Sequence, residues 1–224
     1  MTRRANARIA GLAFLLYIAV GIPALVLMGR ATHGEGIAAQ LASIAQHTTD
    51  VRLAVVLDVF GSFMALVLGV TLYALTRDQD PDLAMLGLTF RVGEGVMGGM
   101  GATRTLGLVW LATATGADAP SRDAAQALGA YLLRGQGGGA TFFAVGSLLF
   151  SWLLLRGRMI PVPLAWLGVV ASLLWIVAFP LQTLRVFPEF ATTFIYILMA
   201  AFEVPLALWL LIKGTAAPVR IQAA

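Results

Sequence analysis

The sequence predicts an all-α protein, an integral membrane bundle of six transmembrane helices. Of its 224 residues, 59% are hydrophobic and only 12% are charged, whereas a soluble domain has about 25% charged residues. The mean hydropathy is +0.87. Six apolar runs approach or exceed the roughly 20 residues that an α-helix needs to cross a bilayer. We therefore expect a single transmembrane domain over residues 1–224.

The six runs are separated by polar or glycine-rich connections. The first run follows several arginines, as in a signal peptide, but it is long enough to span and lacks a clear cleavage site, so we expect it to be retained. The fourth is short, and we expect it to continue from a helical segment at Ser121–Arg134, with Ser121 as its N-cap. The predicted spans are 9–28, 53–75, 83–111, 137–155, 161–181 and 191–211.

The basic residues indicate how these spans are oriented. With a cytoplasmic N-terminus, eight basic residues fall on the inner side and four on the outer side. Lysine and arginine are enriched on the cytoplasmic side, so both termini are predicted to be cytoplasmic, in a bacterial inner membrane. The outer connection at 29–50 carries Ile37, Leu41, Ile44 and Ala45 at helical spacing, which predicts a short helix on the membrane surface.

Three ionisable residues inside the apolar runs predict a site. A charge at the bilayer centre costs roughly 3 kcal/mol on insertion scales, so such residues pair or face a polar cavity. At a rise of about 1.5 Å per residue, Arg91 and Glu94 lie roughly 12 and 16 Å from one face, and Glu203 about 18 Å from the other. We expect these three side chains to converge near the midplane, with Arg91 and Glu94 as neighbours three positions apart.

A second group of charges is expected nearer the outer face. It comprises Asp58, Arg104 and Arg134. Asp58 is predicted to pair with Arg104 or Arg134, and the three residues are further candidates for ligand binding.

Glycines surround the charged part of the third run. Gly95 and Gly99 are four apart, as are Gly98 and Ala102. Small residues at this spacing let another helix approach closely. The face of Gly95 and Gly98 is therefore predicted to contact another helix or a ligand.

Several classes of function lack the residues they need. The chain has no cysteine, two histidines, His33 and His47, and one lysine, Lys213 at the inner boundary. No lysine lies within a span to form a retinal Schiff base, and no histidine lies at depth to bind haem. We expect no metal site and no cofactor. The formal charge of +4 is interpreted as a topology signal, so no nucleic-acid partner is expected.

Short segments along the chain resemble a known family. They begin with RIAGLAFLLYI at the N-terminus and LTFRVGEG in the third run, and continue with LLRGRMIP and FEVPLALWLLIKG. Together they resemble the bacterial multi-pass membrane proteins of domain-of-unknown-function family 4386. The resemblance implies a six-helix membrane protein and no particular activity. Its matching positions include Arg91, Glu94 and Glu203.

The residues leave three functions open. The leading hypothesis is binding or transport of a hydrophobic or amphipathic small molecule, such as a membrane lipid or a lipid-like compound, at Arg91, Glu94 and Glu203. A second is an intramembrane isomerase or cyclase in which Glu94 or Glu203 acts as general acid. A third is an accessory subunit, in which the charges only specify assembly with a membrane-protein partner or a second copy. A closed, dry Arg–Glu network would favour a structural role for the charges.

Overall fold

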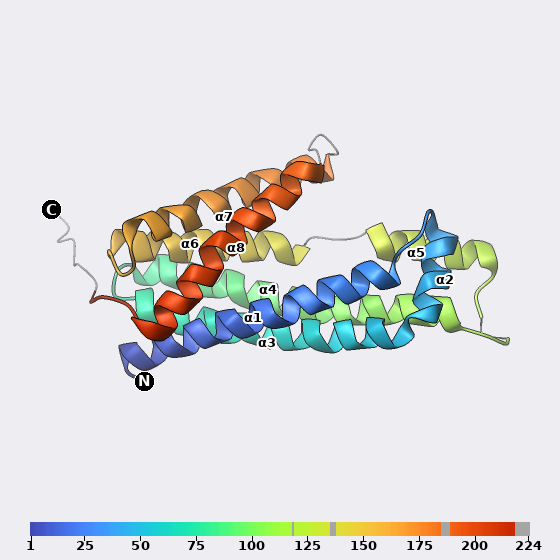
Figure 1. Ribbon diagram of the computed structural model, residues 1–224, viewed down its shortest axis with the longest axis horizontal. Coiled ribbons are helices and arrows are strands. Elements are labelled where there is room, and N and C mark those ends of the chain that lie inside the picture. Colours follow the sequence, from blue (N-terminus) through green and yellow to red (C-terminus); the bar gives the residue numbers. More distant parts are fainter. Residues whose placement is uncertain (118, 135–137, 185–188, 218–224) are drawn as a thin grey trace. The chain divides into compact units, whose positions relative to one another are not determined.

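Eight α-helices make up the described part of this computed structural model (Figure 1). The structure describes residues 1–117, 119–134, 138–184 and 189–217, except the side chains of 134, 138, 183 and 189–192. The bounds are α1 Arg3–Ala31, α2 Ile37–Gln46, α3 Thr48–Thr76, α4 Pro81–Thr113, α5 Arg122–Arg134, α6 Gly138–Arg156, α7 Val162–Thr183 and α8 Glu189–Ile212. No strand occurs within these described ranges, and the predicted all-α class is confirmed.

Five of the described helices, α1, α3, α6, α7 and α8, are long and apolar enough to cross a membrane. The chain is therefore a helical multi-pass membrane protein. Helix α4 is the longest, with 33 residues, but it does not meet the same criterion. Its charged residues Arg91, Glu94 and Arg104, together with its glycines, lower its hydropathy. The count of six spans stays a prediction.

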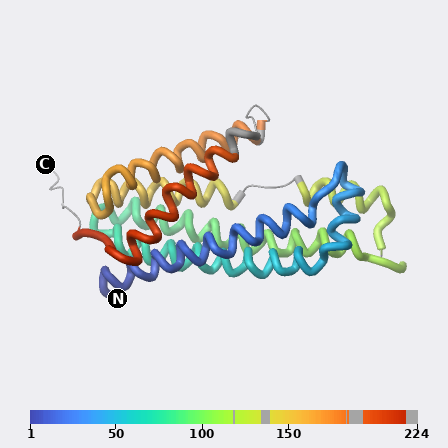
Figure 2. The backbone as a smooth tube through the Cα atoms, viewed as in Figure 1, coloured from blue at the N-terminus to red at the C-terminus, as the bar shows by residue number. Residues whose placement is uncertain are grey.

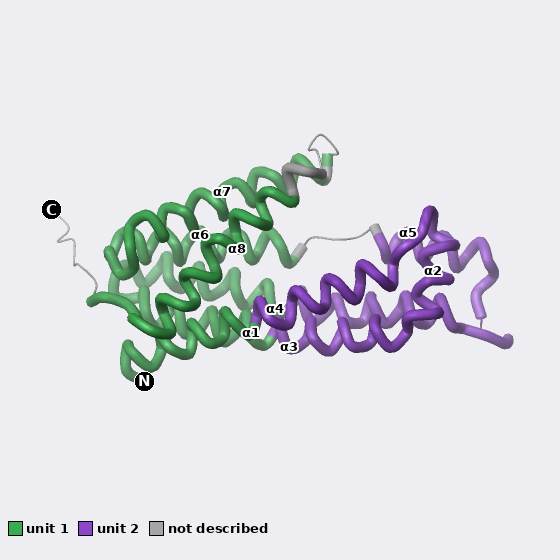
Figure 3. The backbone as a smooth tube through the Cα atoms, viewed as in Figure 1, with its two compact units in different colours: residues 1–16, 63–95, 137–224 green, residues 17–62, 96–136 purple. Residues whose placement is uncertain are grey.

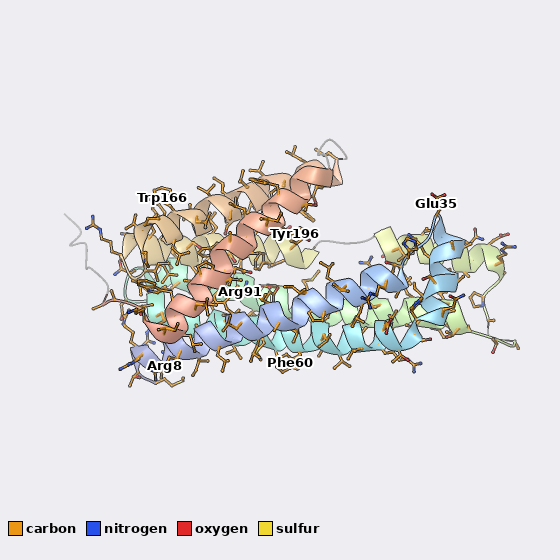
Figure 4. The ribbon with its side chains drawn as sticks, in the orientation of Figure 1. Arg8, Glu35, Phe60, Arg91, Trp166 and Tyr196 are labelled. Atoms are coloured by element: carbon orange, nitrogen blue, oxygen red, sulfur yellow. The ribbon has the colours of Figure 1, made fainter. Side chains whose placement is uncertain are left out.

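The outward surfaces of these helices are apolar. Only 28–39% of the most apolar stretch of each of the five helices is buried inside the protein. Large apolar side chains such as Phe60 and Trp166, labelled in Figure 4, are exposed. Soluble proteins rarely expose so much contiguous apolar surface, and contact with lipid explains it.

The two shorter helices each test a sequence prediction. Helix α2 buries Leu41 and Ile44, so the helix expected from their spacing is confirmed. Helix α5 follows Ser121, whose hydroxyl accepts a hydrogen bond from the Ala124 N–H at 3.3 Å, as expected of an N-cap. The structure describes two helices here, α5 and α6. The continuation of one into the other, expected from the sequence, falls on residues 135–137, which lie outside the described residues.

The helices divide into two compact units, coloured separately in Figure 3. Unit 1 comprises residues 1–16, 63–95 and 137–224, and unit 2 comprises residues 17–62 and 96–136. Helices α1, α3 and α4 each contribute to both units. The prediction of a single domain stays a prediction, and each unit is described by itself.

In unit 1, α6 packs against α7 and α7 against α8, as the backbone trace in Figure 2 also shows. Two glycines mark close approaches among these helices and α1. A Cβ atom on Gly168 of α7 would lie 2.4 Å from the ring of Phe202 on α8. One on Gly11 of α1 would lie 2.6 Å from the backbone oxygen of Ala207 and 2.7 Å from the backbone nitrogen of Leu211 on α8. Helices in lipid associate mainly through such close packing.

Four parts of the chain meet at one end of unit 1, which we call the Arg3 end. They are the start of α1, the α3–α4 connection, the α6–α7 connection and the segment after α8. The contacts are the hydrogen bond from Arg3 to the Leu75 carbonyl at 3.2 Å, the ion pairs Arg3–Asp78 at 3.1 Å and Arg156–Asp80 at 3.3 Å, and the hydrogen bond from Ala216 N–H to the Met159 carbonyl at 3.0 Å.

In unit 2, α2 packs against α5, where Gly129 of α5 lies beside Ile37 and Leu41. The expected contact at the glycine face of α4 is found at Gly98. A Cβ atom there would lie 2.5 Å from the hydroxyl oxygen of Ser62 on α3, whereas none at Gly99 would meet a described atom within 4 Å. The glycine face therefore packs closely at Gly98 but is open one residue later.

Two glycines of α1 provide a matched test of this packing. Gly11→Ala is expected to destabilise the protein by about 1–3 kcal/mol, because backbone atoms of α8 occupy the space that the methyl group would need. Gly21→Ala meets no described atom within 4 Å and is expected to be neutral or stabilising by up to about 1 kcal/mol. Thermal unfolding in detergent measures both changes, and equal effects would contradict the close approach of α1 and α8.

Candidate functional site

Arg91 and Glu94 of α4 form a buried ion pair. The distance from Arg91 Nη1 to Glu94 Oε2 is 2.8 Å, and the two side chains are 1% and 8% exposed. Figure 4 shows Arg91 among the helices of unit 1. The expected pairing of residues three apart on one helix is therefore observed. The pair brings opposite charges into direct contact in the interior of the unit.

Neighbouring helices shape the space around Arg91. A Cβ atom on Gly69 of α3 would lie 2.9 Å from Arg91 Cβ, and one on Gly146 of α6 would lie 3.0 Å from Arg91 Cδ. The guanidinium carbon lies 5.4 Å from the ring centroid of Phe143 on α6, within the range of a cation–π interaction. None of these three residues was predicted from the sequence, since a lone glycine or phenylalanine in an apolar run carries no specific signal.

Glu203 of α8 joins the same region of unit 1. It is 7% exposed and lies close enough to Arg91 and Glu94 to interact electrostatically with both. Its Oε1 atom is buried and has no hydrogen-bond partner among the described residues. We call Arg91, Glu94 and Glu203 the buried charge cluster.

A small cavity adjoins the cluster. It is lined by Arg91, by the serines Ser147 and Ser151 of α6, and by apolar side chains that include Phe150 and Phe202. The space open to the centre of a water molecule is only about 10 Å³, which is near the minimum for one water. In this form the cluster is closed, without room for a larger ligand.

The formal charges of the cluster do not balance. One arginine faces two glutamates, so the fully ionised cluster carries a net negative charge. Burying an uncompensated charge is costly, and a proton on one carboxyl group would neutralise the cluster. Because Arg91 contacts Glu94 directly, Glu203 is the carboxyl group better suited to take up and release that proton. The arrangement can therefore bind a proton, a water molecule or, once opened, a polar group.

The second predicted group of charges is not assembled as expected. Arg104 of α4 donates its Nε–H to the Leu132 carbonyl at 2.7 Å, and its Nη2 donates to the same oxygen. Asp58 is exposed on α3 and forms none of the ion pairs found among the described residues. Of the two partners expected for Asp58, Arg104 therefore forms no ion pair with it in the described structure. The side chain of Arg134 lies outside the described part of the structure.

The position of Leu132 explains where Arg104 binds. The described part of α5 ends at Arg134, so the Leu132 carbonyl lies in its last described turn, and carbonyls at the end of a helix lack a partner within it. A cationic side chain satisfies such a carbonyl and interacts favourably with the helix dipole. Asp58 and Arg104 both belong to unit 2, and they are not part of the buried charge cluster. In the described ranges, no group of three or more His, Asp or Glu side chains could hold a metal ion.

These features define a helical multi-pass membrane protein with a closed charge cluster in one of its units. The chain belongs to the family described as domain of unknown function DUF4386, whose profile matches residues 9–214. The match includes Arg91, Glu94 and Glu203 and confirms the resemblance found in the sequence. No curated protein and no solved structure matches the chain. The family description assigns no activity.

The ion pair can be tested by replacing Arg91 alone and then together with Glu94. Arg91→Met is expected to destabilise the protein by about 3–5 kcal/mol, because it leaves the buried Glu94 carboxylate without its counter-ion. Adding Glu94→Gln should restore part of that loss, since one uncompensated charge is removed. Arg156→Gln, which breaks a partly exposed ion pair with Asp80, should cost about 0–1 kcal/mol. Unfolding in detergent measures all three, and an Arg91→Met variant as stable as Arg156→Gln would contradict the role of the pair.

Proposed function

We propose that this protein binds or transports a hydrophobic or amphipathic small molecule at the buried charge cluster, with Glu203 as the proton-exchanging group. The observation that carries this proposal is the buried Oε1 atom of Glu203, which has no hydrogen-bond partner in the described structure although Glu203 is within electrostatic reach of Arg91 and Glu94. Leaving a buried polar atom unpaired costs about 1–3 kcal/mol. Buried polar groups that are left unpaired at such a cost often have a role in function.

The surroundings of the cluster suit an amphipathic ligand. The adjoining cavity has a polar wall at Arg91 and Ser147 and apolar walls at Phe14 and Leu206. A ligand with one polar end could place that end at the cluster and its apolar part among the helices. Sites for small molecules are usually about 300–1,000 Å³, so binding requires the helices of unit 1 to separate.

Helix α8 offers a point for that movement. Pro205 lies inside α8, two residues after Glu203. Proline has no N–H, so it cannot bond to the carbonyl of Ala201 four residues earlier. Helices in membranes often bend where proline frees a carbonyl. Bending at this position would change the surroundings of Glu203.

The size of the cavity favours a second candidate. A closed cluster with room for only about one water could instead fix how the helices assemble, without ever binding a ligand. In an accessory subunit, the charges would then contribute to folding alone. The two candidates differ in whether Glu203 changes its protonation when a ligand is added.

We also propose six spans with both termini in the cytoplasm of a bacterial inner membrane. The start of α1 and the segment after α8 both lie at the Arg3 end of unit 1. A chain that returns to its starting face crosses the membrane an even number of times. The five apolar helices alone would give an odd number, and α4 supplies the sixth crossing. The arginines at the Arg3 end, Arg3 and Arg156, support a cytoplasmic position for that end.

The protonation of Glu203 can be measured by infrared spectroscopy on the purified protein. The wild type is expected to show the C=O stretch of a buried protonated carboxylic acid, and Glu203→Gln should lose it while remaining folded. Glu94→Gln should retain it. A ligand role predicts that the band shifts when the amphipathic probe decanoate is added. An unchanged band would instead favour the purely structural role, and a band that persists in Glu203→Gln would exclude Glu203 as the proton carrier.

The topology can be tested with single cysteines, because the chain has none. A membrane-impermeant maleimide should label Glu35→Cys in intact cells, since Glu35 is exposed on the connection between α1 and α2 (Figure 4). Thr2→Cys and Ala217→Cys should react only after lysis. Reactivity of both in intact cells would reverse the orientation, and reactivity of only one would mean an odd number of spans.

A further inference from the structure

An open cleft of about 660 Å³ lies in unit 2, between the end of α1 and the second half of α2. Its walls come from residues 26–33 and 43–47. The cleft is separate from the buried charge cluster, whose residues all belong to unit 1. Unlike the cavity at the cluster, it is large enough to hold a ligand group as it stands.

The lining of this cleft favours an anion. Arg30, His33 and His47 contribute nitrogen atoms, and Ser43 and Gln46 add further polar groups. No carboxylate is among its lining residues. The positive charge of Arg30 opposes binding of a metal cation and attracts phosphate, for which the guanidinium group has matching hydrogen-bond geometry.

His47 is held in a defined orientation within this lining. Its Nδ1 lies 2.9 Å from the backbone oxygen of Ser43. Because a carbonyl oxygen only accepts hydrogen bonds, Nδ1 carries the hydrogen. The other ring nitrogen, Nε2, is then the one available to a ligand, and it donates when the ring is cationic.

The surface of α1 leading to the cleft is apolar. Ile22 and Val26 are four residues apart, are 60% and 46% exposed, and lie on the same helix face as Arg30, a further four residues along. Helix α1 is one of the helices apolar enough to span a membrane. The acyl chain of a lipid could therefore lie along Ile22 and Val26 while the lipid headgroup reaches Arg30. A free phosphate ion would make no use of this apolar face.

We propose that this cleft binds the phosphate group of a membrane phospholipid, with Arg30, His33 and His47 as donors and the acyl chain along the Ile22 face of α1. The site does not depend on the function proposed for the buried charge cluster. Charge-assisted hydrogen bonds to Arg30 would carry most of the headgroup recognition. The apolar face would select a lipid over a soluble phosphate.

The test uses the full chain in detergent and follows thermal stabilisation by three probes: dioleoylphosphatidylglycerol, dioleoylglycerol without phosphate, and inorganic phosphate. Only the phospholipid should stabilise the wild type. Arg30→Gln should weaken its apparent affinity about tenfold, as expected for a lost charge-assisted hydrogen bond. Adding His47→Gln to Arg30→Gln should weaken the apparent affinity for the phospholipid further. Arg52→Gln is the matched control, since Arg52 is also exposed in unit 2 but does not line the cleft.

Each other outcome would overturn the proposal. Equal stabilisation by dioleoylglycerol would show that the acyl chains alone are recognised. Stabilisation by inorganic phosphate alone would assign the cleft to a small soluble anion. An equal loss in Arg52→Gln would indicate nonspecific attraction to charge. Arg30→Gln with unchanged affinity would remove Arg30 from the site, and melting temperatures without lipid identify any variant that has simply lost its fold.

Discussion

The packing of unit 1 depends on one constraint, which is that the guanidinium group of Arg91 must be enclosed by other side chains. A charged side chain in an apolar bundle needs a counter-ion and close partners on every side. Glu94 supplies the counter-ion from the same helix, and Phe143 supplies an aromatic ring. Gly69 and Gly146 let α3 and α6 approach the aliphatic part of the side chain. Larger residues at those two positions would separate the helices and admit lipid or water to the charge.

Much of this architecture follows from regular spacing in the sequence. Apolar runs of sufficient length predicted the long helices, and the positions of Leu41 and Ile44 predicted α2. The spacing of three between Arg91 and Glu94 predicted their ion pair, because contacts within one helix depend only on helical geometry. These features are local, so a single sequence contains the information that determines them.

Contacts between helices were less predictable. Asp58 was expected to pair with Arg104 or Arg134 because their charges and estimated depths matched, yet Arg104 binds the Leu132 carbonyl in the last described turn of α5. Every helix end offers such carbonyls, and the sequence does not show which helix end lies beside which side chain. The size of the cavity at the charge cluster was equally inaccessible, since it depends on how the side chains of several helices fill the same space.

The location of the Arg91–Glu94 pair within one helix also has a consequence for biosynthesis. Membrane helices are made in sequence order, and α5, α6 and α7 lie between α4 and α8 in the chain. An arginine whose counter-ion came from α8 would have to enter the membrane unpaired and wait for it. Here the pair is complete as soon as α4 forms. Glu203 is then added to a preformed, electrically neutral pair, so the residue with the least compensated charge is the last of the three to be inserted.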